Sequence, residues 1–174
     1  MLALPDGVVI TGSQDKMVHI WSNGKKVQSF QGHDDIIRQI IPIKDLGFAT
    51  CSNDESIKLW DLSGKLLQTM KGHNAYVYTI ATSVYEEIVS GSEDNTVKVW
   101  KDGAFIDSIA HPGSVWSIVT NSFGDIVTAC EDKEVRVFTR DTTRFAPELA
   151  REEYSKQCIG KSARYLAEFL SLVS

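Results

Sequence analysis

Residues 91–100 read GSEDNTVKVW, and this stretch decides the fold because the chain repeats it. The same pattern aligns without gaps at GSQDKMVHIW (12–21), CSNDESIKLW (51–60) and ACEDKEVRVF (129–138). The aspartate and the closing aromatic residue therefore recur together about every 40 residues, a period typical of repeats built from one four-stranded unit. A second landmark keeps the same step, at His33, His73 and His111. Two landmarks in phase indicate a true internal repeat.

Each repeat has the pattern of short β-strands. Residues 97–100 alternate apolar and polar side chains, as in a strand with one buried face. Residues 115–119 are rich in β-branched and aromatic side chains, which suit a strand buried on both faces. Turn signals such as Asp102–Gly103 follow the third strand of a unit, and no helical period appears before residue 145. The sequence therefore predicts an all-β chain of four-stranded units.

The composition is that of an ordinary globular chain and argues against several classes of partner. The 174 residues include 24% charged residues and carry a formal net charge of −5, so we expect no nucleic-acid surface. No apolar run is long enough to span a membrane, and no membrane partner is expected. Three cysteines without a C-x-x-C pair predict reduced thiols. We therefore expect an intracellular protein of the cytoplasm, with the nucleus as a second compartment, and neither a metal nor a cofactor.

A four-stranded unit of about 40 residues, with Gly-His near its start and a closing tryptophan, resembles the WD-repeat β-propellers. The resemblance covers residues 7–139 and implies a partial propeller of about three and a half blades. Residues 7–30 and 114–139 would each supply three strands, and residues 34–109 two complete blades. Such an arc is about half of a seven-bladed ring. We therefore expect either a truncated product, which we favour, or a second chain that completes the propeller.

We expect two parts in the chain: a propeller segment, residues 1–139, and a linker with a C-terminal helical tail, residues 140–174. Residues 148–157 favour a helix, with Pro147 as its first residue. Apolar side chains at helical spacing predict a second helix that covers an apolar face, formed by Tyr165, Leu166, Phe169, Leu170 and Val173. From Cys158 onward the chain shows no match to the family.

The middle units each contain serine, histidine and aspartate, the residue types of a hydrolytic triad. A triad would occur once rather than once per repeat, and the WD resemblance instead implies an internal hydrogen-bond network. Its members would be His33, Ser52, Asp54 and Trp60 in one unit and His73, Ser92, Asp94 and Trp100 in the next. Because buried polar groups need partners, we expect these residues to hold the fold, and we expect no enzyme. In the last unit Cys130 and Phe138 replace serine and tryptophan, so a hydroxyl and an indole donor should be lost.

Three residues stand at equivalent positions where successive first strands begin, namely Arg38, Tyr78 and Trp116. These residue types are enriched in interface hot spots, whereas a packed blade would carry valine, isoleucine or leucine there. The alternative is that Tyr78 and Trp116 simply plug the wide end of their blades. Five further residues should reach the same narrow face of the propeller: Ile36, Tyr76, Asn53, Glu93 and Glu131. The two glutamates favour a partner with a basic rim.

The order Arg, Tyr, Trp on three consecutive blades and the Val137-Phe138-Thr139 ending resemble the propeller of the phospholipase A-2-activating protein family. Members of that family are ubiquitin-binding adaptors of the hexameric AAA unfoldase. The resemblance implies a ubiquitin-binding face that includes Arg38, Tyr78 and Trp116, and a role in ubiquitin-dependent protein degradation with ubiquitin or ubiquitinated proteins as partners. Ubiquitin's recognition patch is apolar with basic neighbours, which suits aromatic anchors beside glutamates. The alternative function is a structural WD-repeat scaffold without ubiquitin affinity.

Overall fold

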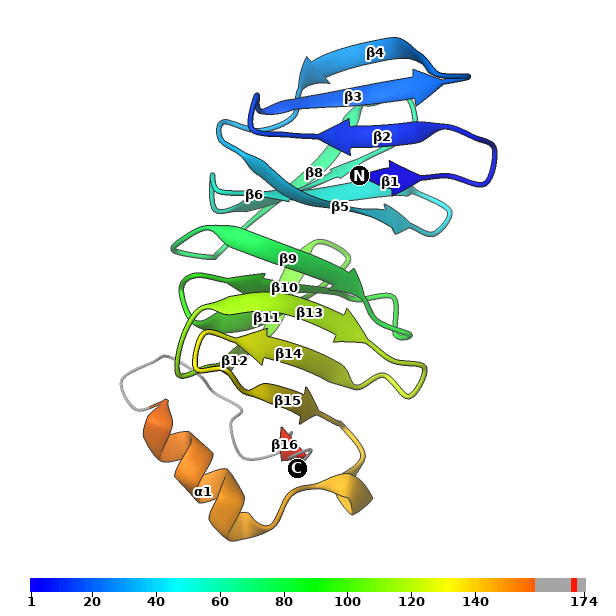
Figure 1. Cartoon of the computed structure of the whole chain (residues 1–174). Coiled ribbons are helices and arrows are strands. Elements are labelled where there is room, and N and C mark those ends of the chain that lie inside the picture. Colours follow the sequence, from blue (N-terminus) through cyan, green and yellow to red (C-terminus); the bar gives the residue numbers. More distant parts are fainter. Residues whose placement is uncertain (159–169, 172–174) are drawn as a thin grey trace.

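The computed structural model describes residues 1–158 and 170–171 of the chain, and these residues form four antiparallel sheets. The sheets follow one another in a stack, from the N-terminal sheet at the top of Figure 1 to the last sheet at the bottom. Each sheet contains four strands hydrogen-bonded in chain order. The prediction of an all-β partial propeller with a short helical tail is confirmed.

The strands have these bounds. The first sheet contains β1 (Leu2–Ala3), β2 (Val9–Gly12), β3 (Met17–Ser22) and β4 (Lys25–Gln31), and the second contains β5 (Ile37–Ile43), β6 (Gly47–Ser52), β7 (Ser56–Trp60) and β8 (Leu66–Lys71). The third contains β9 (Val77–Thr82), β10 (Ile88–Ser92), β11 (Thr96–Lys101) and β12 (Ala104–Ala110). The fourth contains β13 (Val115–Thr120), β14 (Ile126–Cys130), β15 (Val135–Phe138) and β16 (Leu170–Ser171).

Residues 7–30 and 114–139 each supply three strands as expected, but both sheets contain a fourth strand from outside these ranges. Strand β1 pairs with β2, and β16 pairs with β15 through Leu170 opposite Phe138. Both added strands have two residues, which is too short for a periodic signal in the sequence. The described residues therefore contain sixteen strands in four sheets. A second chain that completes the ring stays a prediction.

The predicted second helix is wrong at Leu170, because Leu170–Ser171 lie in strand β16. The outer edge of β15 explains this outcome, since an unpaired strand edge gains hydrogen bonds by taking up another strand. The other four residues of that predicted helix lie outside the described residues.

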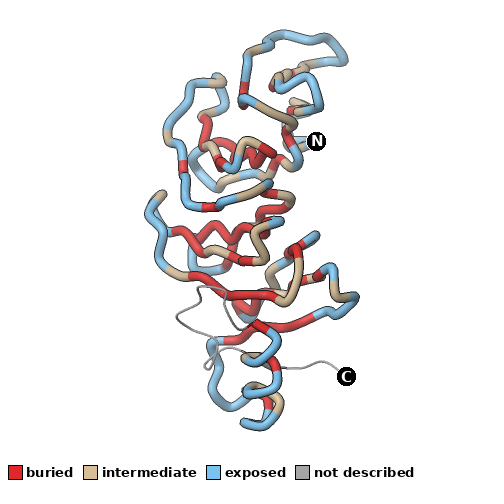
Figure 2. Tube along the Cα trace, turned by 90° about the vertical axis from the view of Figure 1, so that its left-hand side faces the viewer, coloured by how far each residue is buried: buried red, intermediate tan, exposed pale blue. Residues whose placement is uncertain are grey.

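The core lies between neighbouring sheets, which pack face to face. Figure 2 shows the buried positions inside the stack and the exposed ones in the turns and outer strands. The first cluster joins Ile10 and Val18 of the first sheet to Phe48 and Trp60 of the second. The next two clusters repeat this arrangement, first with Trp100 and then with Phe138 at the place of Trp60. The periodic aromatic residue thus packs each of the last three sheets against the preceding one.

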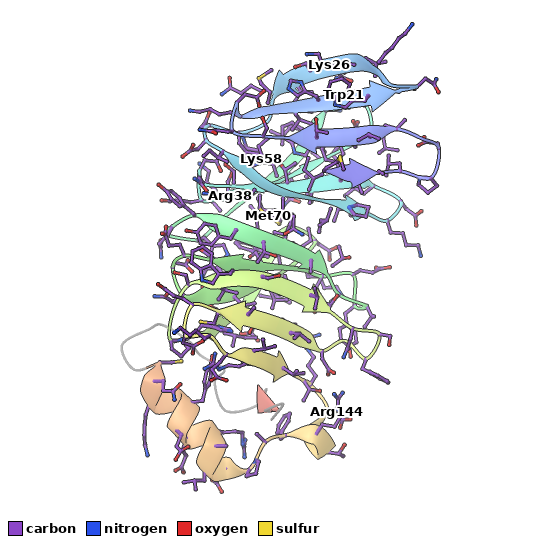
Figure 3. All side chains as sticks on the ribbon, viewed as in Figure 1. Trp21, Lys26, Arg38, Lys58, Met70 and Arg144 are labelled. Carbon is purple, nitrogen blue, oxygen red and sulfur yellow. The ribbon has the colours of Figure 1, made fainter. Side chains whose placement is uncertain are left out.

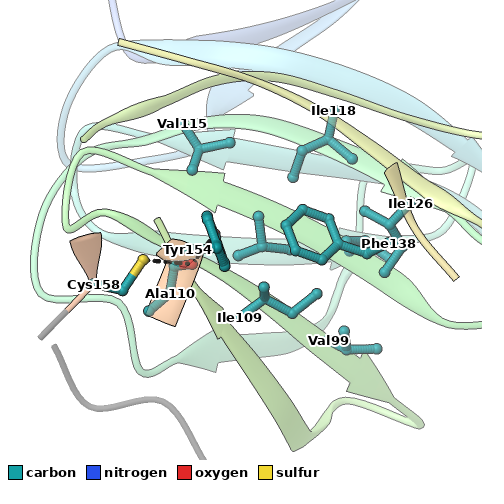
Figure 4. Packing of buried hydrophobic residues seen from close by; sticks show 11 residues of the cluster. Val99, Ile109, Ala110, Val115, Ile118, Ile126, Phe138, Tyr154 and Cys158 are labelled. Atoms are coloured by element: carbon teal, nitrogen blue, oxygen red, sulfur yellow. Dashed lines mark hydrogen bonds between the residues drawn. The ribbon is translucent and has the colours of Figure 1, made fainter. Parts of the chain in front are cut away.

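The C-terminal part contains a 3-10 turn, η1 (Thr142–Arg144), and one helix, α1 (Glu148–Gln157). The predicted helix is confirmed, although Pro147 has extended backbone angles and precedes the first helical residue. Tyr154 and Cys158 join the cluster between the third and fourth sheets, where the Tyr154 hydroxyl donates to the Ala110 carbonyl (Figure 4). Burial raises the pKa of Tyr154. The domain boundary at residue 139 stays a prediction.

Among the described residues, no helix is long and apolar enough to cross a lipid bilayer.

Candidate functional site

Arg38, Tyr78 and Trp116 share one backbone feature in strands β5, β9 and β13. In each strand the pairing register skips this residue: Ile37 pairs with Ser52 and Gln39 with Cys51, so Arg38 has no partner on β6. The same shift leaves Tyr78 unpaired on β10 and Trp116 unpaired on β14. Such a bulge bends the strand and redirects the side chain of the extra residue. Three successive sheets therefore present equivalent side chains away from their cores.

The three side chains form one continuous stack. The rings of Tyr78 and Trp116 are parallel to within 14°, with their centroids 4.8 Å apart. The Arg38 guanidinium carbon lies 5.4 Å from the centroid of the Tyr78 ring, within the range of a cation–π contact. We call Arg38, Tyr78 and Trp116 the stacked ladder. Trp116 is 52% exposed, so it does not plug the interior of its blade. Figure 3 shows Arg38 on the left-hand side of the stack of sheets.

Polar side chains from the neighbouring loops hold the stacked ladder in place. Arg38 Nε donates to Asn53 Oδ1 at 2.6 Å, and the Glu93 carboxylate lies beside the Tyr78 hydroxyl. Burial and this contact raise the pKa of Tyr78. Glu131 differs from Glu93, because its carboxylate accepts from the amide and hydroxyl of Ser114 instead. Asn53 and Glu93 therefore contact side chains of the ladder, whereas the Glu131 carboxylate contacts Ser114.

Ile36 and Tyr76 lie beside the ladder. The Ile36 carbonyl accepts from the Asn53 amide at 3.0 Å, and the Tyr76 carbonyl accepts from the Glu93 amide at 2.9 Å. The Tyr76 ring meets Tyr78 edge-on and is 40% exposed. These bonds fix the loop after the second strand against the start of the first strand. One edge of the stack of sheets therefore carries all five residues predicted to lie near the ladder, namely Ile36, Tyr76, Asn53, Glu93 and Glu131.

The two predicted hydrogen-bond networks are built around buried His-Asp pairs inside the sheets. His33 Nδ1 lies 2.8 Å from Asp54 Oδ2, and His73 Nδ1 lies 2.8 Å from Asp94 Oδ2. Burial alone would raise the pKa of Asp94, but hydrogen bonds from His73 and Thr96 hold it well below its usual range. Burial lowers the pKa of His73. These bonds connect the Gly-His loop to the turn before the third strand.

Sequence reasoning missed the hydroxyl that links histidine to tryptophan. In the second sheet Thr50 Oγ1 lies 2.7 Å from His33 Nε2 and accepts from Trp60 Nε1 at 2.9 Å. Ser90 does the same between His73 and Trp100. Ser52 and Ser92 instead donate to loop carbonyls of Asp35 and Ala75, respectively. The missed signal is a hydroxyl residue ten positions before the tryptophan that closes a repeat, a spacing that Thr11 and Trp21 share.

The last unit lacks two groups of the network, the indole donor and the serine hydroxyl that Phe138 and Cys130 replace. A different hydroxyl is kept there, because Thr128 Oγ1 lies 2.9 Å from His111 Nε2. Cys130 takes the place of Ser52 and directs its Sγ to the Gly113 carbonyl. Asp132 forms a bidentate ion pair with Arg136.

The geometry does not favour hydrolytic chemistry at these sets. Ser52 and Ser92 are 0% exposed, as are Thr50 and Ser90. A nucleophilic hydroxyl has to reach its substrate, and these four are enclosed by their own sheets. The described part of the chain also contains no group of three or more His, Cys, Asp or Glu side chains placed to hold a metal ion.

Acid is expected to destabilise the chain in two steps. Burial makes the pKa of His73 lower in the folded chain than its unfolded-state value of about 6.5. As the pH falls below about 6.5, the unfolded chain takes up this proton more readily than the folded chain, and the free energy of unfolding decreases. The depressed pKa values of Asp54 and Asp94 contribute stability above about 3.9, and this is lost as the pH falls further. Denaturant unfolding at pH 7, 5 and 3.5 should show a decreasing free energy of unfolding. An unchanged value across this range would contradict the assigned directions.

Comparisons with known proteins agree with this geometry. The family model described as "WD domain, G-beta repeat" matches residues 24–61, 64–101 and 103–139. Ubiquitin homeostasis protein lub1 of Schizosaccharomyces pombe is 41% identical over 93 residues, covering 52% of this chain and 13% of that protein. Protein DOA1 of Saccharomyces cerevisiae is 36% identical over 122 residues, covering 45% of this chain and 17% of that protein.

A solved structure shows the same arrangement of sheets. The crystal structure of the WD40 β-propeller domain of Doa1 superposes with a TM-score of 0.79 at 36% sequence identity. The match covers 83% of this chain and 51% of the solved one. The chain therefore spans about half of that propeller and a small part of the complete relatives.

Proposed function

Since this chain belongs to the WD domain, G-beta repeat family of non-enzymatic adaptors, we propose that it binds ubiquitin in ubiquitin-dependent protein degradation. The stacked ladder is the proposed binding surface. One observation carries the proposal: three equivalent bulges bring Arg38, Tyr78 and Trp116 into one exposed stack. The name of the relative lub1, a ubiquitin homeostasis protein, supports the choice of partner.

The chemistry of the stacked ladder suits an apolar patch with basic neighbours, such as the recognition patch of ubiquitin. Flat aromatic faces bury a large area and lose little conformational entropy, because their rotamers are already fixed by stacking. Glu93 lies next to Tyr78 and would lie opposite basic residues at the rim of that patch. Tyr76 would extend the apolar area beyond the stack.

Replacement of Trp116 by alanine tests this proposal. We expect ubiquitin affinity, measured by isothermal titration calorimetry with the full chain, to fall by about tenfold or more, since Trp116 is a half-exposed aromatic anchor. Phe123 provides the matched control, because it is 75% exposed and contacts Arg144 at the other end of its sheet. Phe123→Ala should leave the affinity unchanged.

Two results would overturn the proposal. One is the absence of measurable ubiquitin binding by the unmodified, folded chain, which is the behaviour of a structural scaffold. The other is equal affinity of the Trp116→Ala and unmodified chains, which would place ubiquitin elsewhere on the surface.

A further inference from the structure

A groove separates the second and third sheets at the end of β9 that lies opposite the stacked ladder. Tyr78 lies near the start of β9, whereas Thr82 at its end lines the groove. The groove has a volume of about 720 Å³, within the range of ligand pockets in proteins. Its apolar lining includes Leu59, Met70, Ile88 and Trp100. Figure 3 shows Met70 between the two sheets.

The equivalent gap between the first and second sheets is filled by aromatic side chains. Phe30 lies at the place of Met70, and its ring centroid is 5.0 Å from that of Trp60. Phe48 lies at the place of Ile88 and stacks on the same Trp60. Two aromatic residues of the first gap are thus replaced by smaller side chains in the second.

One cavity between the third and fourth sheets is much smaller than the groove. The cavity there measures about 10 Å³ and is lined by Val99, Ile109 and Phe138 among others. Arg140 covers this side, with its guanidinium over the Tyr85 ring and its ion pair to Glu87. Among these three places in the described residues, ligand-sized space is thus seen between the second and third sheets.

The rim of the groove is acidic. Asp45, Glu86 and Asp102 line it from three separate turns, and all three residues are exposed. Their carboxylates form no ion pair within the described residues, whereas Glu87 is paired with Arg140 at 3.1 Å. Lys44 is the one cation among the lining residues. An apolar floor beneath separated acids complements an apolar group flanked by spaced positive charges.

We propose that this groove binds a short basic peptide segment, with an apolar side chain on its floor and Lys or Arg side chains at its rim. A peptide fits better than a single small cation because the three acids stand on different turns around the opening. Basic side chains also suit such a rim because their aliphatic stems cover apolar surface while their charged ends stay in water. This site is independent of the stacked ladder and of ubiquitin binding.

Fluorescence anisotropy with a labelled hexapeptide tests the proposal. The probe has a central Leu-Phe pair with two arginines on each side, and two matched probes replace the arginines with glutamates or the Leu-Phe pair with serines. We expect saturable binding of the first probe and none of the others. Met70→Phe, which copies Phe30, should weaken binding at least tenfold by filling the floor. Met17→Phe in the first sheet is the matched control and should bind normally.

A second variant tests the proposal even if Met70→Phe fails to fold. The double change Glu86→Gln with Asp102→Asn alters only exposed rim side chains, and should weaken binding and reduce its dependence on salt. Tyr78→Ala should leave peptide binding unchanged. The proposal is overturned by flat anisotropy with the first probe, by normal binding of the double variant, or by loss of binding in Tyr78→Ala.

Discussion

Replacement of Tyr78 by alanine is expected to weaken ubiquitin binding by about 100-fold, or about 2.7 kcal/mol, the largest effect of any single change in the stacked ladder. Tyr78 is the middle member, because its ring stacks on Trp116 and lies beneath the Arg38 guanidinium. Its removal therefore frees both neighbours as well as the central contact surface. Isothermal titration calorimetry with ubiquitin measures the loss.

Tyr78→Phe is the matched control for this prediction. It keeps the ring stack and removes only the hydroxyl that contacts Glu93, so the affinity should fall by no more than about threefold. An equal loss in both variants would show that the hydroxyl, and not the stack, determines binding. Unchanged affinity in Tyr78→Ala would remove the ladder from the interface.

Replacement of Asp94 by alanine is expected to lower the free energy of unfolding by about 3–5 kcal/mol. The Asp94 carboxylate accepts hydrogen bonds from His73, from the Thr96 hydroxyl and from the Asn74 amide. Its loss leaves a buried imidazole and a loop amide without their acceptor, and buried groups without partners carry the full cost of desolvation. Urea unfolding followed by tryptophan fluorescence measures the change.

Asp15→Ala provides the comparison in the first unit. Asp15 pairs with His19, and its side chain is 51% exposed, whereas that of Asp94 is 9% exposed. Water can replace more of the lost contacts there, so we expect a much smaller loss of stability. If the two substitutions cost the same, the buried His-Asp pair has no special part in stability.

The repeat pattern was sufficient to predict the fold class, because strand alternation and the periodic aromatic residue both follow from which face of each sheet is buried. Residue type alone also indicated the ladder, since arginine, tyrosine and tryptophan stand where an interior position would carry an aliphatic side chain. The bulges that present these residues could not be predicted. A bulge depends on the pairing register between two strands, and one strand's sequence does not contain that register.

Other features depended on contacts between distant residues. Thr50 and Ser90 looked like ordinary strand residues until the structure placed each between a histidine and a tryptophan. Strands β1 and β16 have too few residues to show a period. The groove between the second and third sheets lies where Met70 and Ile88 replace Phe30 and Phe48, and its volume appears only once the sheets are packed.

The most direct test of the ubiquitin assignment is a titration of ¹⁵N-labelled ubiquitin with the full chain, followed by NMR. We expect shifts confined to the apolar patch of ubiquitin and its basic neighbours, and we expect them to disappear when the Tyr78→Ala chain is used at the same concentration. Absence of shifts with the unmodified chain, or shifts that persist with the Tyr78→Ala chain, would contradict a ubiquitin site on the stacked ladder.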